Sequence, residues 1–264
     1  MTLVDRLVGE LVDEWDLRLD GSAVRGSHAV VVPVRTADGS PAVAKVGHSE
    51  HEHLVLRRWG GSGAVRLLRA DPHRRALLLE RAGPSSLESL SDVDACAAVV
   101  ELYRALHVPA MPQLPSLSGL LVQWADELSA LPRSAPVPHR LVEQAVALCR
   151  ELSSVPDSHV LHGNLHYGKV LAGERSRWLA IAPRAVNGDP AYEIAPMLWH
   201  RWDELGTGRS VRFGVQRRFF ALVDAAGFDE DRARAWVIAR AVREATRDPS
   251  NMTKYVALVK AVQE

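Results

Sequence analysis

The chain has 264 residues and a mass of 29.0 kDa, enough for one large domain or for two lobes that share a cleft. Its 32 Lys and Arg residues balance its 32 Asp and Glu residues, so net charge predicts neither a nucleic-acid partner nor an acidic membrane surface. No apolar run reaches the roughly 18 residues of a membrane span, and Glu10 and Asp13 interrupt any secretory signal. Cys96 and Cys149 lie in apolar stripes, so we expect buried thiols and a cytoplasmic protein. The sequence predicts no oligomeric state.

The first part of the chain reads as mostly β-structure. Short apolar runs alternate with turn residues, and Asp38-Gly39 is a strong hairpin signal between two of them. The expected elements are a helix over 3–15, strands over 29–35 and 41–46, a helix over 50–59, and strands over 65–68 and 76–80. We therefore predict a β-rich N-terminal lobe over residues 1–84, with a hinge near 81–86.

The second part has helical periodicity. Ser91 and Asp94 approximate a capping box before an apolar stripe, and Gly227 is placed to end a later helix. Further helices are expected over 117–131, 141–152, 190–204, 209–226, 230–246 and 251–263, with a loop and short strands over 160–182. The fold class is therefore α+β, with a helical C-terminal lobe over residues 85–264.

Three sequence blocks carry a specific pattern. They are His-Gly-Asn-Leu-His-Tyr-Gly-Lys over 162–169, Trp-Leu-Ala-Ile-Ala-Pro over 178–183 and Gly-Asp-Pro-Ala-Tyr-Glu-Ile-Ala-Pro over 188–196. In this order and spacing they resemble the catalytic loop and the two following motifs of the aminoglycoside phosphotransferase superfamily. Trp59-Gly-Gly and Leu77-Leu-Leu-Glu-Arg resemble its streptomycin 6-kinase and hydroxyurea phosphotransferase branch. The resemblance covers roughly residues 28–245 and implies a bilobal, protein-kinase-like fold.

The resemblance also assigns roles to individual residues. Lys45 matches the lysine that contacts nucleotide phosphates, and Glu52 matches its acidic partner. Asn164 stands where the family has the catalytic aspartate. Lys169 and Ala182 stand where it has the two Mg²⁺ ligands. The site has thus lost two carboxylates and gained an ammonium.

These substitutions predict altered chemistry. An amide such as that of Asn164 cannot act as a base at neutral pH, and Mg²⁺ requires oxygen ligands that Lys169 and Ala182 do not supply. Lys169, Lys45 and Arg184 could instead neutralise an anionic ligand. We therefore expect no Mg²⁺ and no resident cofactor, with a natural product or a nucleotide as the small-molecule partner. His166 completes the candidate catalytic set.

Three functional hypotheses follow. The first is a pseudokinase, a catalytically degenerate antibiotic-kinase homologue whose cleft binds a polar or anionic ligand. The second is a repurposed enzyme of specialised metabolism, in which the same residues promote a cyclisation, isomerisation or group transfer. The third is an active kinase with an atypical metal site, using Glu193 or Asp189. The sequence analysis favours the first.

An acceptor pocket is expected between the 117–131 helix and the C-terminal helices. Its candidate acidic residues are diluted by four arginines, which favours a ligand less cationic than streptomycin. The acidic candidates are Asp126, Glu127, Glu193, Asp203 and Glu204. Asp189 is expected to cap or brace the catalytic loop.

Overall fold

The computed structural model describes residues 3–26, 29–47 and 49–263. The chain divides into two compact units. The first comprises residues 1–85 and 170–184, and the second comprises residues 86–169 and 185–264. The segment 170–184, which was expected in a C-terminal lobe over 85–264, belongs to the first unit.

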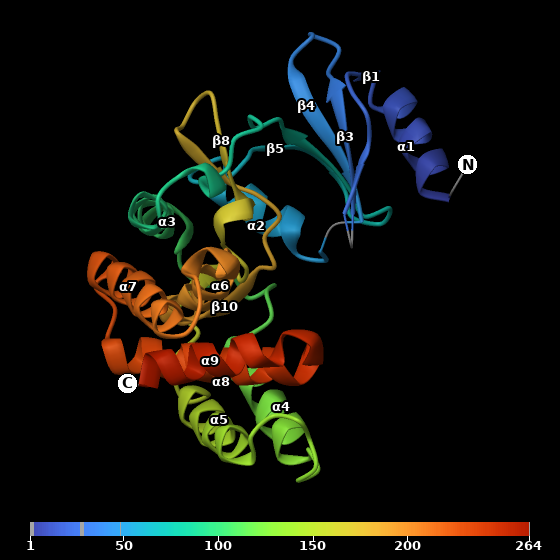
Figure 1. Cartoon of the computed structure of the whole chain (residues 1–264). Coiled ribbons are helices and arrows are strands. Elements are labelled where there is room, and N and C mark those ends of the chain that lie inside the picture. Colours follow the sequence, from blue (N-terminus) through green and yellow to red (C-terminus); the bar gives the residue numbers. More distant parts are fainter. Residues whose placement is uncertain (1–2, 27–28, 48, 264) are drawn as a thin grey trace. The chain divides into compact units, whose positions relative to one another are not determined.

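The first unit is built on a six-stranded antiparallel sheet with the strand order β1-β3-β4-β6-β5, in which β2 also pairs with β3 (Figure 1). Its elements are α1 (Leu3–Glu14), β1 (Arg18–Leu19), β2 (Val24–Arg25), β3 (Val30–Arg35), β4 (Pro41–Val46), α2 (Glu52–Trp59), β5 (Leu67–Asp71) and β6 (Ala76–Glu80). The β3–β4 hairpin turns at Gly39, whose φ is 83°, as the Asp38-Gly39 signal predicted.

Alternation along the strands creates the core of this unit. In β3, Val30, Val32 and Val34 are buried, and the intervening side chains are only partly so. Leu11 and Trp15 pack on this apolar face, so that α1 covers one side of the sheet (Figure 1). Burial of these side chains is the main free-energy gain that holds α1 in place.

A second hairpin, β8 (Val170–Ala172) with β9 (Trp178–Ala180), belongs to the same unit. The Val65 amide donates to the Ala180 carbonyl over 3.1 Å, and the Ala172 amide donates to the Ser85 carbonyl over 2.8 Å. The Arg175 guanidinium contacts the Glu80 carboxylate at 2.9 Å. These contacts explain why 170–184 joins the N-terminal part of the chain.

The second unit is mainly helical and also contains the two-stranded sheet of β7 with β10. Its longer elements are α3 (Asp92–Leu106), α4 (Leu117–Ser129), α5 (His139–Leu152), β7 (His159–Leu161), β10 (Val186–Gly188), α6 (Ile194–Trp199), α7 (Arg209–Ala226), α8 (Glu230–Arg247) and α9 (Met252–Gln263). Five short 3-10 helices complete the described chain: η1 (Leu87–Ser89), η2 (Tyr167–Lys169), η3 (Pro190–Glu193), η4 (Trp202–Leu205) and η5 (Pro249–Asn251). Helices α8 and α9 run side by side (Figure 1).

Local signals set several element ends. The Ser91 hydroxyl accepts from the Asp94 amide over 3.2 Å at the start of α3, and Gly227, with φ 68°, ends α7. Both thiols are buried and reduced, as expected. No helix in the described ranges is both long and apolar enough to span a bilayer.

Two element predictions were wrong, and two short strands were not predicted. The helix expected over 190–204 is broken into η3, α6 and η4, and the break between α6 and η4 falls at Arg201, which adopts a left-handed conformation with φ 53°. The strand expected over 65–68 is shifted to β5. The strands β1 and β2, two residues each, carried no recognisable pattern.

Candidate active site

The first unit brings Lys45 and Glu52 together. Lys45 lies in β4 and Glu52 begins α2, and their side chains are 10% and 1% exposed. The Lys45 ammonium donates to both carboxylate oxygens over 2.7 Å. A buried charge needs such a partner, because an unpaired ion in a low-dielectric interior is costly. The pair expected from the sequence is therefore formed.

The same unit carries Ala182 and Arg184, just after β9. Ala182 has φ 52°, a left-handed conformation that an alanine rarely adopts. The Ser49 hydroxyl donates to the Pro183 carbonyl over 3.0 Å and so ties this segment to the start of α2. The Arg184 side chain is exposed, and its role in ligand binding stays a prediction.

The catalytic-loop segment, residues 162–169, lies in the second unit between β7 and β8. Gly163 adopts φ 78°, which glycine accommodates without strain. Its amide donates to Glu193 Oε1 over 3.0 Å, and its carbonyl accepts from Arg240 Nη2 over 3.2 Å. Both backbone polar groups of Gly163, the residue beside Asn164, are therefore hydrogen-bonded to buried ionisable side chains.

Glu193 was a candidate acceptor-pocket or metal-site residue, but the structure buries it completely against the loop. Burial raises the pKa of its carboxyl to about 7, although the Gly163 amide, Arg240 and the amides of His162 and Leu165 all lower it. This carboxyl supports the loop that carries Asn164. The sequence did not reveal that role, because 30 residues separate the two partners.

His166 and Lys169 occupy the end of the loop. The His166 ring stacks on His200, with centroids 3.5 Å apart and planes at 6°. The Gly168 amide donates to His166 Nδ1 over 3.3 Å, and the Lys169 amide donates to the His166 carbonyl over 2.8 Å. Burial, with the nearby charges of Lys254 and Lys169, lowers the pKa of His200 to about 4. His200 is therefore neutral at physiological pH.

The other candidates have different partners from those expected. Asp189 caps η3 and accepts from the Trp236 indole over 2.8 Å, so its contacts stay outside the loop. Glu204 pairs with Arg201, with Nε and Oε1 2.8 Å apart. A surface cavity of about 380 Å³ lies between α4 and α5. Its lining residues fall between 128 and 150, and none of them belongs to the catalytic-loop segment. The location of the acceptor pocket stays a prediction.

The residues matching the family's metal positions do not fit Mg²⁺. Lys169 offers only donors, and Ala182 offers a methyl group, whereas Mg²⁺ requires oxygen ligands in near-octahedral geometry. Within the described ranges, no three His, Cys, Asp or Glu residues gather as a metal would need. No step proposed below therefore passes through a metal ion.

A sheet-based unit with a buried Lys–Glu pair and a helical unit with a braced loop are typical of the kinase-like fold, and similar solved structures agree. Choline kinase LicA from Streptococcus pneumoniae matches with a TM-score of 0.64 and 10% identity, covering 99% of both chains. The family described as aminoglycoside/hydroxyurea antibiotic resistance kinase matches residues 14–250. The chain belongs to this family.

Two relatives show the branch. The chain is 38% identical to streptomycin 6-kinase of Streptomyces glaucescens, across 92% of this chain and 82% of that protein. It is 37% identical to hydroxyurea phosphotransferase of Kitasatospora aureofaciens, across 89% and 70%. The predicted fold class, superfamily and branch are confirmed.

The functional hypothesis favoured by the sequence analysis is contradicted. Relatives at 37–38% identity are named as streptomycin 6-kinases and a hydroxyurea phosphotransferase, which points to an active antibiotic kinase and away from a degenerate pseudokinase.

Proposed function

We propose that this chain is an antibiotic kinase that transfers the γ-phosphoryl group of a nucleoside triphosphate to an oxygen atom of a small antibiotic. The observation that carries the proposal is the 38% identity to a streptomycin 6-kinase, extending over 92% of the chain. The close likeness to a hydroxyurea phosphotransferase extends the proposed acceptors to small hydroxylated molecules beyond aminoglycosides.

Lys45 is proposed to bind the nucleotide phosphates. An ammonium has three N–H donors, and the Glu52 carboxylate accepts from it through both oxygens. The carboxylate thus holds Lys45 Nζ at one position while leaving donor capacity for a phosphate oxygen. Preorganising a charge in this way favours the transition state, because little reorganisation is needed when phosphate charge redistributes.

Asn164 is proposed to orient the acceptor oxygen through its side-chain amide. Phosphoryl transfer proceeds through a loose transition state, so positioning and charge neutralisation supply most of the rate enhancement. An amide can still accept a hydrogen bond from a hydroxyl and direct its oxygen toward phosphorus. The site can therefore lack a carboxylate base and keep the positioning part of the reaction. The acceptor oxygen bonds to the γ-phosphorus as the bond to the bridging oxygen of the departing nucleoside diphosphate breaks, and the hydroxyl proton passes to an oxygen of the transferred phosphoryl group or to water.

Lys169 is proposed to replace part of the charge that a metal ion supplies in related kinases. Lys169 is the last residue of the catalytic-loop segment, and it brings a positive charge to a position that the family pattern gives to a neutral asparagine. We accordingly propose a nucleotide complex with a weak requirement for Mg²⁺.

The test is transfer of radiolabelled γ-phosphate from ATP to streptomycin, hydroxyurea and a panel of aminoglycosides. Wild type is compared with Lys45→Met and with the matched control Lys260→Met, which changes an exposed lysine of α9. We expect Lys45→Met to lose on the order of a hundredfold in rate or more, and Lys260→Met to keep the wild-type rate.

Each arm has a decisive outcome. Absence of labelled product with every acceptor, at any Mg²⁺ concentration, would overturn the kinase proposal. Loss of all transfer in EDTA would overturn only the proposed weak metal requirement. Equal rates for the two lysine variants would remove Lys45 from the mechanism.

A further inference from the structure

Tyr167 lies inside the catalytic-loop segment, between His166 and Gly168, and is fully buried. Its hydroxyl donates to Asp92 Oδ1 over 3.1 Å. Two guanidinium groups flank its ring, because the Cζ atoms of Arg201 and Arg218 lie 4.7 and 5.4 Å from its centroid. Such cation–π contacts fix the orientation of a ring in addition to burying it.

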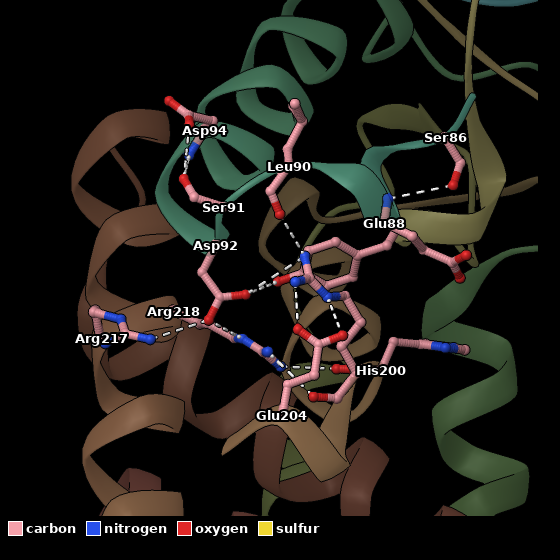
Figure 2. A network of polar contacts seen from close by, with 12 residues as sticks. Ser86, Glu88, Leu90, Ser91, Asp92, Asp94, His200, Glu204, Arg217 and Arg218 are labelled. Atoms are coloured by element: carbon pink, nitrogen blue, oxygen red, sulfur yellow. Dashed lines mark hydrogen bonds and ion pairs between the residues drawn. The ribbon is translucent and has the colours of Figure 1, made fainter. Parts of the chain in front are cut away.

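Asp92, the first residue of α3, collects several of these groups. Arg217 Nη2 donates to Asp92 Oδ2 over 3.1 Å, and Arg218 Nε forms an ion pair with the same oxygen at 3.0 Å (Figure 2). Burial on its own would raise the pKa of this carboxyl, but Arg218, Arg217 and Tyr167 together lower it. Asp92 is therefore ionised and available to the Tyr167 hydroxyl.

Arg218, in α7, connects this carboxylate to a different part of the chain. Its side chain is completely buried, and Nη1 and Nη2 donate to the carbonyls of His200 and Arg201 over 2.8 and 3.3 Å (Figure 2). One guanidinium thus joins the start of α3 to the turn after α6. The planar guanidinium thus donates two hydrogen bonds in fixed directions while its charge pairs with Asp92, a combination that a lysine ammonium does not offer.

The turn held by Arg218 is strained. Arg201 has φ 53°, a left-handed conformation that a non-glycine residue keeps only when its surroundings enforce it. Its own Nη1 donates to the Leu90 carbonyl over 2.9 Å, and its Nε donates to Glu204 over 2.8 Å. The hydrogen bond that Arg218 donates to the Arg201 carbonyl is a third contact that holds this left-handed backbone.

The same turn presents the His200 ring to the loop. His200 stacks on His166 at 3.5 Å, and the carbonyl of His200 is the one that Arg218 holds at 2.8 Å. Arg218 therefore acts on two consecutive loop residues. It reaches Tyr167 through Asp92 and the cation–π contact, and His166 through His200.

We infer that Arg218 is a positioning residue that fixes the orientation of the loop segment His166–Lys169. This inference rests on the proposed kinase function for its effect on rate. A buried ion pair contributes little net stability compared with apolar packing. The benefit of the arrangement is therefore geometric, because small displacements of reacting groups reduce rates strongly.

The experiment compares Arg218→Gln with Arg217→Gln. Both changes remove an arginine contact to the same Asp92 oxygen, but only Arg218 holds the two carbonyls. Kinase rates are measured together with the imidazole Hε1 resonances of His166 and His200, which stacking shifts by mutual ring currents. We expect Arg218→Gln to reduce kcat on the order of a hundredfold, with KM for ATP changed less than about twofold, and to move both resonances. Arg217→Gln should leave the resonances in place.

Tyr167→Phe serves as a milder variant, because Arg218→Gln removes a buried charge and can impair folding. Tyr167→Phe removes only the hydroxyl that donates a hydrogen bond to Asp92. The kcat should therefore fall on the order of tenfold in a folded protein. Unshifted histidine resonances in folded Arg218→Gln would overturn the inference, as would unchanged kcat in an active enzyme. If wild type proves inactive, the proposed function fails, while shifted resonances still support the positioning of the loop.

Discussion

The two units hold their charged groups in different ways. In the first unit, Lys45 is held by one partner, and the two buried side chains neutralise each other. In the second unit, the loop is held by several charged groups whose partners are largely backbone atoms, such as the Gly163 amide and the His200 carbonyl. A pair of side chains can be replaced together, whereas backbone groups persist after any substitution. We therefore expect that the Lys45–Glu52 pair can be replaced by two apolar side chains together, and that the charged groups that hold the loop cannot be replaced in this way.

The largest expected effect comes from separating the Lys45–Glu52 pair. Glu52→Ala leaves a buried ammonium without its partner, so the free energy of unfolding should fall by about 3–5 kcal/mol. The double variant Lys45→Met/Glu52→Leu should recover most of that loss and remain inactive. Urea denaturation of the three proteins provides the measurement.

A double variant that is no more stable than Glu52→Ala would contradict the view that the pair is exchangeable. Activity in the double variant would show that phosphates are bound elsewhere.

A smaller effect is expected from Glu193, whose pKa is raised from 4.5 to about 7. Between these values the unfolded chain releases a proton that the folded chain keeps. The free energy of unfolding should therefore fall as pH rises through this window, by about 3 kcal/mol in total from this group. Glu193→Gln cannot titrate and should lose this component.

The check is the difference in unfolding free energy between Glu193→Gln and wild type, measured from pH 4 to pH 8. Other titrating groups contribute equally to both proteins and cancel in the difference. A difference that stays constant with pH would show that Glu193 titrates near its ordinary value.

The smallest expected effect concerns the backbone at Ala182. Ala182→Gly relieves a left-handed alanine and should raise the free energy of unfolding by up to about 1 kcal/mol. Ala180→Gly, two residues earlier in β9, has no such strain to relieve and should lower it by about the same amount. Thermal denaturation of both variants compares the signs, and a loss of stability in both would argue against strain at 182.

Local pattern predicted much of the fold. The Asp38-Gly39 turn, the Ser91 cap and the end of α7 at Gly227 each depend on neighbours within a few residues, and each was confirmed. The break at Arg201 was missed because it is enforced by Arg218 and by the Leu90 carbonyl, which lie 17 and 111 residues away. The hydrophobic periodicity of a segment carries no information about contacts with residues so far away in the sequence.

The candidate site divides in the same way. Motif spacing located Lys45, Glu52 and the loop residues, and the structure shows the pair formed. It did not locate Glu193 or Arg218 as supports of the loop, because their partners are backbone groups or residues remote in sequence. The substitutions at Asn164, Lys169 and Ala182 led to the pseudokinase hypothesis. Similarity along most of the chain to relatives that are named as kinases points the other way.

The left-handed backbone at Ala182 has a consequence for how this site can change. Aspartate and asparagine tolerate that conformation better than alanine does, so the chain retains a backbone shape that suits a carboxylate side chain. A change of the second base turns the alanine codons GCU and GCC into aspartate codons and the alanine codons GCA and GCG into glutamate codons. A single nucleotide substitution could therefore return an acidic group to this position without any rebuilding of the surrounding chain.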